Sequence, residues 1–405
     1  MTQAEAYEKE YRNRYRDKPL EDIIVFRSGP MPESYTPGMD FDDNARALFE
    51  YALQIQLNDR YALVWFVKDP AERSIQYREY KNVSFISYEA AWSEDPAERD
   101  VYYRSLCLAR YIFMTDTYGF ALQARPDQIR VMLWHGCGFK TRLGFASNED
   151  HYEYMTVTGD EYARTYARVF GLRDDQMLVT GYPKADYLFH PVRRWKEMFD
   201  IPEAASYIFW LPTFRNTDRE DLARHDHTAP KGDLGLPVLQ SAKDLEEVNA
   251  HLAAKDTVLV IKLHPFQNRK RIRDISRLSH IRLLENADML RHDIQINQLL
   301  GHAEALISDY SSAAVDYLVL DRPVAMTLDD IETYEKERGF FWEDVRPWLP
   351  GYEIYGKEDF VRFLDGVMGG ADPGSKKRHA VMDQMQKYRD DKSAQRVLEA
   401  LGIRA

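Results

Sequence analysis

The sequence predicts an α/β protein of two doubly wound domains, each a parallel sheet with helices on both faces. Apolar runs of strand length alternate with helical patterns along the chain, which is typical of parallel sheets joined by helical crossovers. The alternation begins a second time after residues 190–200, and 405 residues suffice for two domains. We therefore expect one domain over 1–195 and another over 196–381, facing each other across a cleft.

The first half opens with a helical pattern over 3–18, in which Tyr7, Tyr11 and Tyr15 form a stripe between arginines. We expect this stripe to pack on the protein or a partner subunit rather than on a membrane. Hydrophobic periodicity predicts the next elements in order: strand 23–29, helix 43–54, strands 62–69 and 83–88, a helix running into a strand over 102–116, and strand 129–136.

The second half repeats the alternation after a helix over 192–199. The charged, glycine-containing stretch 215–236 is too long to be a plain connector. The same periodicity predicts the remaining elements: strand 206–215, helix 242–254, strands 257–265 and 281–286, helix 296–303, strands 305–309 and 323–328, and a final helix 382–402.

Composition excludes several classes of protein. Lys and Arg number 54 against 66 Asp and Glu, a net charge of −12 that does not favour binding to nucleic acid. The two cysteines, Cys107 and Cys137, have no metal-ligand spacing and suit a reducing cytoplasm. The charged N-terminus does not resemble a signal peptide, and no apolar window is long enough to span a membrane. We expect a cytoplasmic protein.

Four unusual clusters fall at the ends of expected strands: WHG at 134–136, PTFR at 212–215, KLHP at 262–265 and SDYSS at 308–312. Ligands of open parallel sheets bind beyond the carboxyl ends of the strands. A cleft between the two domains would bring all four clusters together.

The SDYSS turn has the chemistry of a phosphate site. Backbone amides and hydroxyls of Ser311 and Ser312 would open a helix, where the helix dipole favours a phosphate or diphosphate. Asp309 is expected to order the loop or to accept a hydroxyl proton. A simple helix cap remains the alternative.

Two further clusters supply cations for the same ligand. Lys262 and His264 lie on one face of a strand, where the histidine binds a phosphate oxygen, protonates a leaving group, or is structural. Arg215 offers a planar donor fork for phosphate, and Thr213 precedes it in the same donor-binding segment.

His135 is the candidate general base. Gly136 and Gly138 permit close backbone approach and leave the imidazole exposed on a tight turn. The histidine would take a proton from a hydroxyl nucleophile, with Gly136 and Lys140 on the acceptor side. Cys137 is disfavoured as a nucleophile because no activating partner is assigned. The acids are not clustered, so no metal site is predicted.

Taken in order, these motifs resemble the CDP-glycerol glycerophosphotransferase family, whose members build teichoic acids and related polyol-phosphate polymers. The resemblance extends from about residue 25 to 400, and its other motifs are GYP at 181–183, RGFFW at 338–342, PG at 350–351 and DDKSAQRV at 390–397. It implies a GT-B fold of two Rossmann-like domains, with the final helix in 382–405 returning to the first domain.

The resemblance also implies an activity: transfer of a polyol phosphate from CDP-glycerol or CDP-ribitol to a hydroxyl acceptor, with release of CMP. The family's two important histidines fall on His135 and His264. Its diphosphate-binding residues fall on Ser311, Ser312 and Arg215. No cofactor is required, although Mg²⁺ bound to the diphosphate stays open.

Two departures leave the substrates open. The family usually continues WHG with Thr-Pro-Leu-Lys, where this chain has Cys-Gly-Phe-Lys at 137–140, and GYP with Arg-Asn-Asp, where it has Lys-Ala-Asp at 184–186. The acceptor is therefore a polyol phosphate, a glycan or a lipid-linked molecule. Contact with the cytoplasmic face of the membrane and homo-oligomer formation are also open. The alternatives are a GT-B glycosyltransferase that uses a nucleotide sugar and a scaffold without activity.

Overall fold

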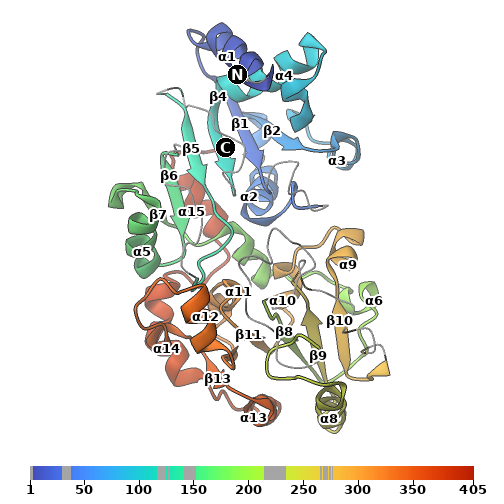
Figure 1. The fold of residues 1–405 in the computed structure, drawn as a ribbon. Coiled ribbons are helices and arrows are strands. Elements are labelled where there is room, and N and C mark those ends of the chain that lie inside the picture. The colour runs from blue at the N-terminus through green and yellow to red at the C-terminus, as the bar shows by residue number, and fades with distance from the viewer. Residues whose placement is uncertain are drawn as a thin grey trace.

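The computed structural model describes residues 3–29, 38–115, 125, 127–140, 152–213, 234–264, 267, 272, 275 and 277–405. In these residues it contains two wholly parallel sheets, one of seven strands and one of six, each flanked by helices (Figure 1). The predicted α/β class with two doubly wound sheets is confirmed.

The first sheet has the strand order β3-β2-β1-β4-β5-β6-β7. At its centre, Val25 pairs with Val64 on one side and with Ile112 on the other. Its strands are β1 (Glu21–Arg27), β2 (Ala62–Val67), β3 (Val83–Ser87), β4 (Ala109–Met114), β5 (Ile129–Met132), β6 (Tyr154–Val157) and β7 (Met177–Val179). Its helices are α1 (Gln3–Tyr15), α2 (Asp43–Gln54), α3 (Pro70–Gln76), α4 (Pro96–Leu108) and α5 (Asp160–Phe170), followed by the 3₁₀ helix η6 (Pro183–Phe189).

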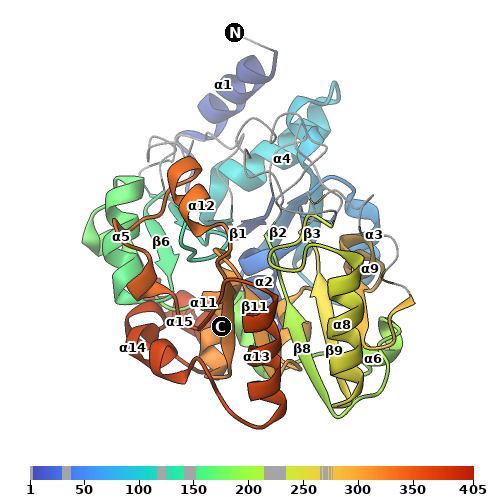
Figure 2. The same ribbon diagram turned by 60° about the horizontal axis from the view of Figure 1, so that its bottom comes forward.

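The second sheet has the order β10-β9-β8-β11-β12-β13, and α8 and α13 cover one of its faces (Figure 2). Its strands are β8 (Ser206–Trp210), β9 (Thr257–Lys262), β10 (Ile281–Leu284), β11 (Ala305–Ser308), β12 (Val324–Thr327) and β13 (Tyr352–Ile354). The helices of this half are α6 (Trp195–Met198), α8 (Ala242–Ala253), α9 (Asn286–Arg291), α10 (Asn297–Leu300), α11 (Ala313–Tyr317), α12 (Ile331–Glu337), α13 (Lys357–Met368), α14 (Ser375–Met385) and α15 (Ser393–Ala400).

The central strands are apolar along nearly their whole length because both faces of each sheet are covered. β2 (ALVWFV) and β9 (TVLVIK) each bury five consecutive residues. Such continuous runs are typical of parallel sheets with helices on both sides. Among the described residues, one hydrophobic cluster joins the two halves, with Phe139 and Tyr182 from the first and Tyr310 and Val315 from the second.

The tyrosine stripe of α1 packs on the protein, as predicted. Tyr11 is 1% exposed, its ring stacks on Tyr103 of α4 at 5.0 Å, and its hydroxyl donates to the Pro96 carbonyl. The Tyr15 hydroxyl donates to Asp100 of the same helix. No helix in the described part of the chain combines the length and apolar character that a membrane crossing requires.

The single helix predicted over 382–402 is wrong. The chain forms α14 and α15 instead. α15 lies with the first sheet, whereas α14 contacts α5 of the first half and pairs through Arg378 with Asp321 of the second (Figure 1). A new helix starts at Ser393 because a carboxylate from a distant segment caps it. Asp186 accepts hydrogen bonds from the amides of Ser393 and Ala394, both at 2.9 Å. The elements β6, α5 and β7 were not predicted.

Candidate active site

His135 lies on the turn after β5, beside the start of α2. The preceding residue, Trp134, has a left-handed backbone with φ of 58°, as does Asp43 with φ of 60°. A non-glycine residue in this region costs about 1–2 kcal/mol. The side-chain amide of Asn44 donates to the Trp134 carbonyl at 2.8 Å and holds the turn in place. Strain of this kind gathers at functional sites.

The imidazole of His135 is paired with Asp43. Its Nδ1 lies 3.2 Å from Asp43 Oδ2, and the histidine side chain is 42% exposed. Although burial opposes its charge, Lys184 and the hydrogen bond from His135 hold the pKa of Asp43 below its usual value. An ionised carboxylate only accepts, so Nδ1 carries the hydrogen and Nε2 is left as a proton acceptor.

The SDYSS turn of the second half is in contact with this histidine turn. A Cβ placed on Gly136 would lie 2.4 Å from Ser312 Oγ, and one on Gly138 would lie 3.5 Å from the Ser312 amide nitrogen. Glycine is therefore required at 136 for close approach. The structure brings together the two motifs that the sequence placed on opposite sides of the cleft.

A cluster of cations surrounds His264 at the end of β9. Burial, followed by the charges of Lys140, Lys262 and Arg338, lowers the pKa of His264 to about 3. The imidazole is thus neutral near pH 7 and lies in a field that favours an anion. Lys140 comes from the histidine loop, whose backbone pairs with Phe340, two residues after Arg338.

A cavity of about 350 Å³ lies between the halves and is lined by Asp43 from the first and by Lys262 and His264 from the second. Its polar wall includes both members of the aspartate pair that starts α2, and His264 faces it from the second sheet. It is lined by Gly38, Met39, Phe41, Asp42, Asp43, Arg46, Arg73, Lys262, His264, Asn286, Met289, Leu290, Asp293, Ile294, Gln295 and Ile296.

The remaining predicted residues lie around this core. The amide and hydroxyl of Thr213 both donate to Asp309 Oδ2 at 2.8 Å, which ties the end of the PTFR segment to the SDYSS turn. Ser311 Oγ accepts from the Ala313 amide at 3.3 Å at the start of α11. Arg215 lies outside the described residues.

Sequence reasoning missed three residues: Asp43, Lys184 and Arg338. Asp43 and His135 are 92 residues apart, and an acid at a helix start is read as a cap. Lys184 stood out in the sequence only as a departure from the family's usual residue after GYP, although its ammonium contacts the His135 carbonyl and Asp43. Arg338 was noted only within a motif. For Lys184 and Arg338, the sequence offered one signal: a basic residue next to a loop at the end of a predicted strand.

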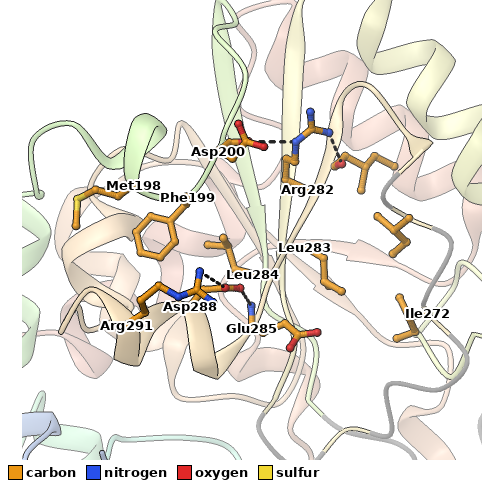
Figure 3. A pocket seen from close by; sticks show the side chains of 12 residues that line it. Met198, Phe199, Asp200, Ile272, Arg282, Leu283, Leu284, Glu285, Asp288 and Arg291 are labelled. Carbon is orange, nitrogen blue, oxygen red and sulfur yellow. Dashed lines mark hydrogen bonds and ion pairs between the residues drawn. The ribbon is translucent and has the colours of Figure 1, made fainter.

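A larger cavity, of about 710 Å³, lies at the edge strand β10 (Figure 3). Phe199, Leu284 and Ile272 form apolar parts of its wall, and Arg282 Nε donates to the Asp200 carbonyl beside it. None of the predicted site residues lines it. Size alone therefore does not identify the site.

Comparison with known proteins agrees with the motifs. The family model of CDP-glycerol:poly(glycerophosphate) glycerophosphotransferase matches residues 31–402, most of the chain. The chain belongs to this family. Among curated proteins, the chain is 26% identical over 314 residues to the teichoic acid ribitol-phosphate polymerase TarK of Staphylococcus aureus (strain NCTC 8325 / PS 47), covering 72% of this chain and 56% of that protein. It is 24% identical over 308 residues to the teichoic acid glycerol-phosphate primase of Bacillus subtilis (strain 168), covering 71% and 72%.

The chain spans about half the length of the first curated relatives that it matches, 56% of TarK and 51% of TarL. Among solved structures, the wall teichoic acid polymerase TagF is similar with a TM-score of 0.70 and 17% identity, over 98% of this chain and 93% of that chain. A putative UDP-N-acetylglucosamine 2-epimerase from Listeria monocytogenes has a TM-score of 0.52 at 12% identity, over 95% and 96%. The likeness to TagF confirms the GT-B fold that the family resemblance implied.

Proposed function

We propose that this chain transfers a polyol phosphate from CDP-glycerol or CDP-ribitol to a hydroxyl acceptor and releases CMP, in the synthesis of a teichoic-acid-like or capsular cell-surface polymer. Membership of the glycerophosphotransferase family supports the reaction. The observation that carries the proposal is the contact between the His135 turn, with its Asp43 partner, and the Ser312 turn of the other half.

In this mechanism the acceptor hydroxyl enters beside His135. Nε2 takes its proton as the acceptor oxygen forms a bond to the polyol-side phosphorus. The bond from that phosphorus to the oxygen of CMP breaks, and CMP leaves with the electron pair. Asp43 keeps Nδ1 protonated and stabilises the imidazolium that forms. A base placed in this way contributes about 10²–10⁴-fold in rate.

The donor side neutralises the charge on the diphosphate and on departing CMP. We assign this role to His264, Lys262 and the Ser311 and Ser312 hydroxyls, and we keep the sequence-based assignment of Arg215 to the same role. A diphosphate would oppose the cations that depress the pKa of His264, so binding lets this histidine protonate the leaving oxygen. Each well-placed donor contributes about 3 kcal/mol to stabilising the transition state.

The other predicted residues have supporting parts in this proposal. Thr213 and Asp309 bond to each other, so we assign them to holding the donor loop rather than to direct phosphate contact. Gly136 allows the acceptor turn to approach Ser312. Lys140 was predicted on the acceptor side, and because its charge also lowers the pKa of His264, we propose that it interacts with the diphosphate as well.

The partners follow from the same chemistry. We propose a polyol-phosphate, glycan or lipid-linked acceptor, and a location in the cytoplasm or at the cytoplasmic face of the membrane. Mg²⁺ accompanying the diphosphate and a homo-oligomer also remain proposals. Titration of the purified chain with EDTA and light scattering test these two points.

The deciding experiment is a donor screen that follows nucleotide release from CDP-glycerol, CDP-ribitol and UDP-sugars. We expect CMP from a CDP-polyol. His135→Ala should abolish release while CDP-glycerol binding survives in calorimetry. His251→Ala is the matched control, because His251 of α8 pairs with Asp365 of α13 at 2.6 Å and does not line the cavity. UDP release, or normal turnover in His135→Ala, contradicts the proposal.

A further inference from the structure

Lys184 is a buried cation beneath the candidate site. It lies in η6, after the GYP turn, and its side chain is 11% exposed. Its ammonium donates to the His135 carbonyl and lies 3.1 Å from Asp43 Oδ1. It also lies 3.5 Å from Asp316 Oδ2 in α11, the helix that follows Ser312. One ammonium therefore contacts both the general-base turn and the donor-side helix.

The backbone around Lys184 fixes the same turn. Its amide donates to Asn44 Oδ1 at 3.1 Å, and the amide group of Asn44 holds the Trp134 carbonyl. A Cβ on Gly136 would lie 3.7 Å from the Lys184 ammonium. The lysine thus lies directly under the point where the two turns meet.

The charges around this ammonium are unbalanced without it. Asp42, Asp43 and Asp316 face it, and burial raises the pKa of Asp42 and of Asp316 to about 6. The pKa of Lys184 is raised, since the three carboxylates outweigh its burial. The neighbouring groups Cys137, Tyr162 and Tyr182 have pKa values raised by burial and are neutral near pH 7. Lys184, 3.1 Å from Asp43 Oδ1, therefore stabilises the ionised form of Asp43 together with His135, while Arg46 also acts on the neighbouring Asp42.

We propose that Lys184 is a positioning residue for phosphate transfer: it holds Asp43 ionised, and Asp43 in turn fixes His135 with Nδ1 protonated and Nε2 facing the acceptor. This inference rests on the proposed function for its effect on turnover. Its effect on the tautomer of His135 does not depend on that function.

The test compares Lys184→Met with Lys184→Arg. Lys184→Met should lower kcat for CMP release by about 10²-fold, since the base loses its orientation, while the Kd for CDP-glycerol stays within about threefold. Lys184→Arg keeps the charge and should recover at least about a tenth of the wild-type kcat. In an Asp43→Asn background, Lys184→Met should have little further effect, because both act through one carboxylate.

Removal of a buried cation risks unfolding, so the variant with both Lys184→Met and Asp316→Asn is included; it removes one uncompensated carboxylate. The same loss of kcat is expected in it. Normal turnover in Lys184→Met or in the double variant overturns the proposal. So does a further loss of kcat when Lys184→Met is added to Asp43→Asn, or a loss of donor affinity as large as the loss of kcat.

A measurement without turnover separates the two proposals. In ¹⁵N spectra of histidine-labelled protein, with His135 assigned from His135→Asn, the wild type should show the Nδ1–H tautomer and Lys184→Met should move toward Nε2–H. An unchanged tautomer overturns the role of Lys184. Absence of CMP release from the wild type, with the tautomer shift present, overturns the proposed function alone.

Discussion

The protonation states of single residues in this chain depend on groups that are distant in the sequence. His264 is the plainest case, because burial and the charges of Lys140, Lys262 and Arg338 together lower its pKa to about 3. An anionic ligand reverses the effect of these charges. In the function proposed above, the protonation of this histidine reports whether a diphosphate occupies the site.

This gives a prediction for pH. The pKa of His264 is low in the free protein and rises when CDP-glycerol binds, so binding takes up a proton. Affinity should increase as pH falls below the pKa of the bound state, by up to about tenfold per unit, until the pKa of the free protein near 3 is reached. Calorimetry from pH 8 to 5 checks this.

His264→Asn is the comparison, since Asp42 lines the same cavity and has a pKa of about 6. The pH dependence that remains in His264→Asn belongs to other groups. Identical profiles in the wild type and His264→Asn would contradict the prediction.

Gly136 supports a second prediction at this scale. Gly136→Ala would place a methyl group 2.4 Å from Ser312 Oγ and force the two turns apart. We expect a loss of stability of about 1–3 kcal/mol from overpacking and a fall in kcat. Gly356→Ala is the control because nothing lies within 4 Å of its added Cβ. Urea denaturation and CMP release measure both effects, and equal behaviour of the two variants would refute the close contact.

At the scale of elements, the short GYPKAD segment connects the C-terminal helix α15 to the first sheet and also contributes Lys184 to the candidate site. Asp186 caps α15 through the amides of Ser393 and Ala394 and so docks the C-terminal helix on the first sheet. A Cβ on Gly181 would meet Ser393 Oγ at 2.6 Å, which makes the same junction tight. The segment thus carries a helix cap and, at Lys184, a cation of the site.

Asp186→Ala should lower the free energy of unfolding by about 1 kcal/mol, the usual effect of losing a helix cap. Hydrogen exchange should increase over α15 (Ser393–Ala400) and spare α14. Asp383→Ala is the matched control, as its side chain is 81% exposed and pairs with Arg389 on the surface. Unchanged exchange in α15 would contradict the capping role.

At the scale of the whole molecule, an ion-pair network closes one side of the cleft. Asp293, after α9, accepts from Arg46 of α2 at 2.9 Å and from Arg73 of α3 at 2.9 Å. Arg46 also donates to the Asp293 carbonyl at 3.0 Å. All three residues line the cavity that also holds His264. This network joins the two halves at the cavity of about 350 Å³ that lies between them.

Asp293→Asn should weaken this junction and favour a more open arrangement of the halves. We expect a larger radius of gyration in small-angle scattering and a higher KM for the donor, with kcat at saturation changed less. Asp175→Asn is the control, since Asp175 and Arg173 form a surface pair that is about 70% exposed. A scattering profile identical to that of the wild type would contradict the proposed role of this ion-pair network in holding the two halves together.

The sequence determined the central strands of both sheets, helix 43–54 and the motifs at the strand ends. Helix 43–54 has the same bounds as α2, and the apolar runs of β2 and β9 predicted buried parallel strands because a strand covered on both faces needs apolar residues throughout. The strand-end positions of His135, His264 and Ser312 followed from the same periodicity. These features depend on local patterns, which a single sequence records.

Only the tertiary structure decided which side chains interact with one another at the candidate site. Asp43, Lys184 and Asp316 come from three distant segments, and each reads locally as an ordinary helix or turn residue. Lys184 and His135, brought close by folding, keep Asp43 ionised against its burial, whereas burial and three nearby cations keep His264 neutral. Coulomb interactions depend on separation in space and on solvent exposure, and neither quantity is written in the order of residues along the chain.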